Sequence, residues 1–243
     1  MATAEIDAFQ LLLKEHPWPR SRPLSYVEPF SWSLDGGGRH LIQKIIESRP
    51  NATLLEIGSF MGGSALQFLQ YSESLRMVLC DPWSYHLTLY ANSLVHRKWA
   101  IQAYGMSKLL GYASLLNQYD PFLLVQNNLY EYRQRCVLIK QPVPRAYWTC
   151  VMADLKPDIV YIDARKQRKE FWDAHHAFPN AILCGDDWSW RRRQCDSFRV
   201  REFVNEIAAE RNASVYADRM TFVIHEKRHD INLDSRYEFI QPS

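Results

Sequence analysis

Short apolar runs alternate along this chain with longer segments of helical periodicity. Buried parallel strands read as continuous apolar runs of roughly four to eight residues, and such runs lie at 53–57, 75–80, 136–140, 157–162 and 181–184. Apolar positions three and four residues apart predict helices at 39–48, 65–71, 145–153, 167–178 and 200–211. Alternating segments at 214–217 and 220–225 predict a closing hairpin. The pattern predicts an α/β fold: a Rossmann-like doubly wound sheet of about seven strands, mostly parallel, with a C-terminal antiparallel hairpin.

The strand pattern is interrupted in three places. Residues 1–38 form an N-terminal extension, with a helix at about 4–15 and then a loop rich in Pro, Ser and aromatic residues. Residues 39–226 form one domain, in which 84–135 has no strand alternation and many tyrosines. We expect this stretch to be a helical insertion that acts as a lid or a substrate wall, because long ordered insertions are often functional. The alternative is that its tyrosines are packing residues. The polar tail, 227–243, is expected to be partly disordered.

Composition excludes several classes of protein. The chain is 47% hydrophobic and 23% charged, which is typical of a globular protein. A net charge of +2 gives no reason to expect nucleic acid as a partner. No apolar run is long enough for a signal peptide or a membrane span. The cysteines have no zinc or CxxC spacing, so we expect a reduced, cytoplasmic protein; they are Cys80, Cys136, Cys150, Cys184 and Cys195.

A glycine turn follows the first predicted strand. Gly58 ends the apolar run, Gly62 and Gly63 allow a close approach of the backbone, and Ser64 lies in the first turn of a helix. Free amides at a helix N-terminus are a ready site for an anionic group. The dinucleotide fingerprint G-x-G-x-x-G fails because position 60 is Phe, and Glu56 to Gly62 reads E-x-G-x-x-x-G instead. The alternative is a tight turn that binds nothing.

The second and third predicted strands end in candidate cofactor contacts. Asp81 follows the second strand, about twenty residues beyond the glycine turn, where an acid binds ribose hydroxyls in doubly wound folds. The alternative role of Asp81 is a helix cap. Trp83 is a candidate for the adenine face, and Gln141 lies where such folds contact adenine.

Three acids follow the fourth and fifth predicted strands. Asp163 ends the fourth strand, and Asp186 and Asp187 follow the fifth. Adjacent strands are about 4.8 Å apart, so we expect these carboxylates to converge and to repel one another unless a cation lies between them. Oxygen ligands suit Mg²⁺, Mn²⁺ or Ca²⁺. Lys166 lies three residues beyond Asp163. In the alternative reading, the acids cap turns, Lys166 is a solvated residue, and the arginines at 191–193 are either solvated or bind an acidic substrate group.

These motifs together resemble a known family. E-x-G-x-x-x-G resembles the first motif of class I S-adenosylmethionine (SAM)-dependent methyltransferases, and Glu56, Gly58, Phe60 and Ser64 match that motif in the catechol enzymes. YIDARK followed by CGDDW resembles the metal-dependent catechol and caffeoyl-CoA O-methyltransferases. It is even more similar to the bacterial methyltransferases that carry IDA and GDDW segments. The resemblance covers roughly residues 39–226, with departures at Arg165 and at Asp187, where Asn is usual.

The resemblance implies an activity and a set of roles. The expected function is SAM-dependent methylation of a small-molecule hydroxyl, such as that of a natural product, a sugar or a catechol. The glycine turn would hold the methionine end of SAM, Asp163 would contact the cofactor, and Lys166 would act as base. Mg²⁺ or Mn²⁺ would bind Asp163, Asp186 and Asp187. We expect no nucleic acid or membrane partner, and the sequence leaves a homodimer open. The alternatives are an inactive SAM-binding partner protein and an α/β protein that binds another nucleotide.

Overall fold

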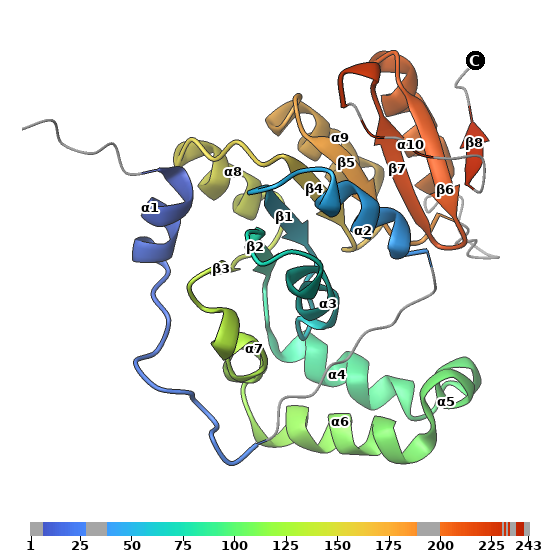
Figure 1. Ribbon diagram of the computed structural model, residues 1–243. Coiled ribbons are helices and arrows are strands. Elements are labelled where there is room, and N and C mark those ends of the chain that lie inside the picture. The colour runs from blue at the N-terminus through green and yellow to red at the C-terminus, as the bar shows by residue number, and fades with distance from the viewer. Residues whose placement is uncertain are drawn as a thin grey trace, which may run out of the picture.

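An eight-stranded sheet forms the centre of the molecule in the computed structural model, which describes residues 7–27, 38–188, 200–229, 231, 233 and 237–240 (Figure 1). The strand order is β3-β2-β1-β4-β5-β7-β6-β8. The first five strands are parallel: β1 (Thr53–Ile57), β2 (Arg76–Asp81), β3 (Cys136–Lys140), β4 (Ile159–Ile162) and β5 (Ile182–Gly185). The antiparallel strands are β6 (Ser214–Asp218), β7 (Thr221–His225) and β8 (Glu238–Ile240). The predicted fold class is confirmed, and the eighth strand lies in the tail that the sequence predicted to be partly disordered.

Helices cover both faces of the sheet because alternate residues of each strand point to opposite sides. On β1, Leu54 packs on one side with α2 (His40–Glu47) and α3 (Gly63–Tyr71). Leu55 packs on the other side with α1 (Ala8–Glu15), α8 (Arg145–Met152), α9 (Arg168–Ala177) and α10 (Val200–Glu210). Strands buried on both faces explain the continuous apolar runs of the sequence. None of the described helices is long and apolar enough to cross a membrane.

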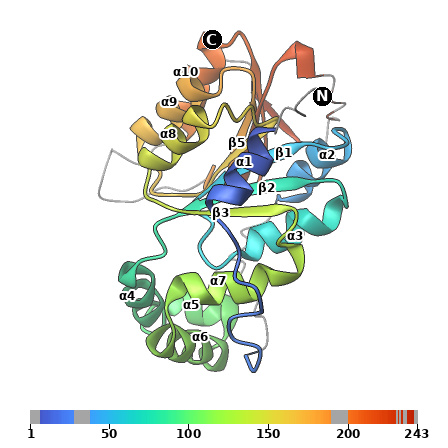
Figure 2. The ribbon, with the colours of Figure 1, turned by 90° about the vertical axis from the view of Figure 1, so that its left-hand side faces the viewer.

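A helical insert joins β2 to β3. It contains α4 (Tyr85–Leu94), α5 (Lys98–Tyr104), α6 (Met106–Gln118), α7 (Pro121–Leu129) and a 3₁₀ turn, Tyr130–Tyr132. Figures 1 and 2 show α4, α5 and α6 as a group below the sheet. The Thr88 hydroxyl donates to the Leu116 carbonyl (3.0 Å), and Asn92 and Asn117 exchange amide hydrogen bonds, so α4 and α6 are tied together.

The N-terminal extension covers the free edge of β3. Phe9 and Leu12 of α1 are fully buried against the sheet. Further along, the Trp18 indole donates to the Cys136 carbonyl of β3 (2.7 Å), and Arg22 donates to Asn127 of α7. An exposed edge strand invites pairing with other chains, so this cover protects the parallel end of the sheet.

Candidate active site

Left-handed backbone marks the carboxyl ends of four neighbouring strands. The residues are Phe60 (φ 46°) after β1, Trp83 (φ 37°) after β2, Lys166 (φ 59°) after β4 and Asp187 (φ 70°) after β5. A bulky residue with positive φ is strained, and such strain is concentrated at functional sites. Ligands of open α/β sheets bind at this same edge. The candidate active site is therefore the edge formed by these four loops.

The glycine turn is fixed by the packing of the protein itself. A Cβ atom on Gly58 (φ 89°) would lie 2.3 Å from the Asp163 carbonyl oxygen. A Cβ atom on Gly62 (φ 78°) would lie 2.9 Å from a Leu129 methyl group of α7. The two glycines thus bring the turn against the loop that carries Asp163 and against the helical insert. This contact places the candidate cofactor loop beside the candidate catalytic acids.

Glu56 is a buried acid with one unsatisfied oxygen. It lies on β1 and is fully buried, and the Ser64 hydroxyl of α3 donates to its Oε1 atom. Its Oε2 atom is buried and has no hydrogen-bond partner among the described residues. Burial raises the pKa of Glu56 to about 7, although Ser64 and the positive charge of Arg39 act against this rise. A buried polar atom of this kind is costly unless a ligand completes it.

Asp81 connects the first two loops of the site. Its two oxygens accept the Phe60 N–H (3.1 Å) and the Trp83 N–H (2.9 Å). Burial raises the pKa of Asp81 to about 6, and these two hydrogen bonds oppose the rise. A carboxylate has about four acceptor positions, so Asp81 retains capacity for hydroxyl donors of a ligand. Its predicted ribose contact stays a prediction.

The two residues predicted to contact adenine have other partners in this structure. Trp83 is fully buried, its indole donates to the Phe60 carbonyl (2.5 Å), and its ring centroid lies 5.3 Å from that of Phe122. It would have to move to stack on a ligand. Gln141 accepts a hydrogen bond from the Thr149 hydroxyl of α8 (2.7 Å). No pattern in the sequence indicated that Trp83 belongs to the core.

Lys166 forms ion pairs with two of the predicted metal ligands. Its Nζ atom lies 2.7 Å from Oδ1 of Asp163 and 2.6 Å from Oδ2 of Asp187. Burial would lower the pKa of Lys166, but the two carboxylates outweigh burial and raise it above its usual value. In this arrangement Lys166 is an ammonium at neutral pH, and its predicted role as a base stays a prediction.

Asp186 belongs to a separate buried group. Its Oδ1 accepts the Thr221 hydroxyl of β7 (2.8 Å), and its Oδ2 lies 3.4 Å from the Arg39 guanidinium. Burial and the Asp163 charge raise the pKa of Asp186 to about 6, and Arg39 opposes them. Asp163, Asp186 and Asp187 do not bring one oxygen each to within 4.8 Å of one another. Lys166 pairs with Asp163 and Asp187, whereas Arg39 pairs with Asp186. The three side chains in this arrangement therefore do not fit one shared metal ion.

Arg39 is a site residue that sequence reasoning missed. It precedes α2, is only 3% exposed, and donates to Gln67 of α3 (3.3 Å) as well as contacting Asp186. Its charge also opposes the rise in the pKa of Glu56 that burial causes. In the sequence it is one arginine at the start of an amphipathic helix, and no motif distinguishes it. The arginines at 191–193, which the sequence offered as candidates for an acidic substrate group, lie outside the described residues.

The helical insert contributes Tyr90 to the site. The Tyr90 ring lies 6.1 Å from Phe60 in an edge-to-face contact, and Arg97 lies 5.7 Å from the Tyr90 centroid. Burial raises the pKa of Tyr90, whereas Arg97 and Lys166 oppose the rise and the charges of Asp163 and Asp187 add to it. Through the contact between Tyr90 and Phe60, α4 lies beside the glycine turn and forms one wall of the site.

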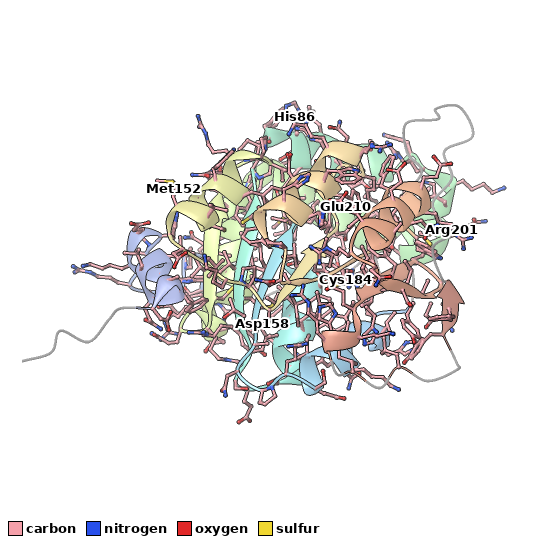
Figure 3. The ribbon with its side chains drawn as sticks, turned by 90° about the horizontal axis from the view of Figure 1, so that it is seen from above. His86, Met152, Asp158, Cys184, Arg201 and Glu210 are labelled. Carbon is pink, nitrogen blue, oxygen red and sulfur yellow. The ribbon has the colours of Figure 1, made fainter. Side chains whose placement is uncertain are left out.

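A second polar cluster lies away from this edge. His175, His176 and Glu210 are the one group of three metal-type side chains found close together in the described residues. Figure 3 shows Glu210 on α10, beside α9. Arg211 donates to Nδ1 of His175 (2.8 Å), so the proton of that ring is on Nε2, which lies 3.0 Å from Glu210. His175 has no lone pair left for a metal, and the cluster is structural.

No protein-family model matches the chain, and no curated protein matches its sequence. Solved structures with a similar fold include an O-methyltransferase of Bacillus cereus in complex with S-adenosylhomocysteine (17% identity, 91% of this chain and 98% of that chain, TM-score 0.49). Another is an O-methyltransferase of Streptomyces achromogenes involved in tomaymycin synthesis (18% identity, 93% and 92%, TM-score 0.43). A third is a precorrin-6y C5,15-methyltransferase of Geobacter metallireducens (11% identity, 80% and 91%, TM-score 0.45). At such identities and TM-scores, the similarity does not assign the chain to a family.

Proposed function

We propose that this protein is a SAM-dependent methyltransferase that methylates a hydroxyl of a small molecule. The observation that carries the proposal is the buried Glu56, whose Oε2 atom has no partner among the described residues beneath a glycine turn. Around it, the strand-end loops present Asp81, Asp163 and Asp187. Lys166 already supplies positive charge to Asp163 and Asp187, whereas Glu56 and Asp81 can still accept hydrogen bonds or positive charge from a ligand.

The charge of the site favours SAM over other nucleotides. SAM carries an ammonium, a sulfonium and two ribose hydroxyls, so it offers positive charge and donors to Glu56 and Asp81. The phosphates of NAD or ATP would meet the same carboxylates and be repelled by them. The first turn of α3 offers free amides to the carboxylate of SAM. We place the ammonium of SAM near Glu56 and its ribose near Asp81.

The reaction requires alignment and removal of one proton. The acceptor oxygen attacks the methyl carbon, the carbon–sulfur bond breaks, and its electron pair stays on sulfur. The acceptor proton passes to the carboxylate of Asp163 or Asp187. Lys166 donates a hydrogen bond to the acceptor oxygen, and Tyr90 closes the opposite wall. The acceptor is a neutral hydroxyl compound such as a natural product, a sugar or a catechol.

Calorimetry with SAM, S-adenosylhomocysteine, NAD and ATP tests the proposal. We expect binding of the first two ligands only. Asp81→Ala should weaken SAM binding by about 1–3 kcal/mol, because it removes charge-assisted hydrogen bonds to the ribose. Asp158→Ala is the matched control: Asp158 also accepts a backbone N–H, that of Thr53, but it precedes β4 at the opposite edge (Figure 3).

Two outcomes would contradict the proposal. Binding of NAD or ATP in preference to SAM would make the chain a different nucleotide-binding protein. Normal SAM binding without any product mass shift, in a screen of sugars, catechols and natural products, would favour an inactive SAM-binding partner protein. Equal losses for the Asp81 and Asp158 variants would show that Asp81 acts only through the fold.

A further inference from the structure

We infer that the Lys166 ammonium replaces a divalent metal ion at this site, so that the protein works without one. The inference deepens the proposed function and rests on it for the identity of the reaction. The resemblance to metal-dependent O-methyltransferases assigned an ion to Asp163, Asp186 and Asp187. The geometry instead puts the Nζ atom of Lys166 between Asp163 and Asp187, at 2.7 and 2.6 Å.

The lysine is built into this position. It lies in the turn after β4 with left-handed backbone (φ 59°), and its side chain is only 21% exposed. Both distances are those of strong hydrogen bonds between an ammonium and a carboxylate. A divalent ion bound to the same two carboxylates would lie close to this positive charge and be repelled by it. The space between the two acids is therefore already taken by a cation.

Asp186, the third expected metal ligand, already has other partners. Asp186 is 5% exposed, and its two oxygens already contact the Thr221 hydroxyl and the Arg39 guanidinium. Turning Asp186 toward an ion would separate the buried Arg39 from its carboxylate, and an uncompensated buried charge is strongly unfavourable. Without Asp186, the remaining carboxylates are those of Asp163 and Asp187, and Lys166 is paired with both of them.

The replacement gives Lys166 a defined task. An ammonium has three N–H groups, and two of them are directed at Asp163 and Asp187. The third is left to donate to the oxygen of a methyl acceptor. A tethered ammonium thus positions the acceptor and stabilises negative charge on its oxygen, which is the task that a bound ion performs in metal-dependent enzymes.

Mn²⁺ binding to the full-length protein, measured by electron paramagnetic resonance, tests the inference. The wild-type protein should bind no Mn²⁺ below about 1 mM, which is the weak limit of the dissociation constants found for built oxygen-ligand cation sites. Lys166→Ala should gain Mn²⁺ affinity by at least tenfold, because Asp163 and Asp187 then face each other without a cation. Adding Asp187→Ala to that variant should remove the gain.

Lys169→Ala is the matched control. Lys169 also pairs with a carboxylate, that of Asp173 (2.6 Å), but on the exposed surface of α9, so this variant should gain no affinity. Wild-type binding at micromolar Mn²⁺, or Lys166 variants that fold and gain no affinity, would overturn the inference. If Lys166→Ala does not fold, Lys166→Gln keeps the length of the side chain. SAM titrations of the same samples report separately on the proposed function.

Discussion

At the scale of single residues, the site contains acids whose charged form is destabilised by burial. Glu56, Asp81 and Asp186 are buried, and burial raises the pKa of each to between about 6 and 7. Each therefore binds its proton more tightly in the folded chain than in the unfolded chain. Binding a cationic ligand would relieve this cost, so the same residues that destabilise the free protein are suited to hold SAM.

Glu56→Gln tests directly whether Glu56 lowers the stability of the free protein and strengthens SAM binding. The folded pKa of about 7 lies above the ordinary value of 4.5, so the free protein loses stability as pH rises from 4.5 through 7. Removing the charge should raise the free energy of unfolding at pH 8 by about 1–3 kcal/mol, since each pKa unit corresponds to about 1.4 kcal/mol. At pH 4 the variant and the wild type should be nearly equal.

Urea unfolding without ligand at pH 4, 6 and 8 measures the effect, and calorimetry should show weaker SAM binding to the same variant. Glu170→Gln is the control, because Glu170 is a buried acid on α9 that takes part in a helix capping box. A Glu56→Gln protein that is less stable than the wild type at pH 8 would show that Glu56 is satisfied without ligand.

At the scale of elements, the insert between β2 and β3 contacts the glycine turn of the site through α4 and α7. Tyr90 of α4 meets Phe60 of the glycine turn, and α4 is joined to α6 by the hydrogen bond from Thr88 to Leu116. α7 packs more tightly, with Leu129 against Gly62. We therefore expect α4 to α6 to move together as the outer wall of the site, and α7 to stay with the sheet.

Hydrogen exchange should distinguish these two parts. Amides of 85–118 should exchange at least severalfold more slowly when S-adenosylhomocysteine is bound, because the ligand orders the turn at Phe60 that α4 contacts. Amides of α8, on the opposite face of the sheet, serve as the internal control and should be unchanged. Equal exchange of 85–118 with and without ligand would leave the insert as ordinary scaffold.

At the scale of the whole molecule, the sequence predicted the parts of the fold that local patterns encode. Buried strands produce apolar runs, and the glycine turn and the strand-end acids come directly after these runs in the sequence. Contacts between distant residues leave no such trace. The pairing of Arg39 with Asp186, the burial of Trp83 and the pairing of Lys166 with Asp187 depend on how packed elements face each other. The acids of the site and Lys166 were found from the sequence, whereas Arg39 and the ion pairs between these cations and acids were not.

The Arg39–Asp186 pair joins three parts of the molecule, and its removal gives the last prediction. Arg39 lies before α2, Asp186 follows β5, and Thr221 of β7 completes the contact. Arg39→Met leaves the Asp186 charge buried without a cation, which should lower the free energy of unfolding by about 3–5 kcal/mol at pH 8. The loss should be smaller at pH 5, because Asp186 is then protonated, its pKa being raised to about 6 even beside Arg39.

The double variant Arg39→Met with Asp186→Asn should recover much of that stability, since it removes both charges, and urea unfolding of the four proteins forms a complete cycle. Arg168→Met is the matched control: Arg168 pairs with Glu206 on the exposed surface, and such pairs contribute about 1 kcal/mol or less. If Arg39→Met costs no more than Arg168→Met at pH 8, the buried pair does not stabilise the fold. Arg39 would then act only through the pKa of Glu56, and SAM affinity would be the quantity that changes.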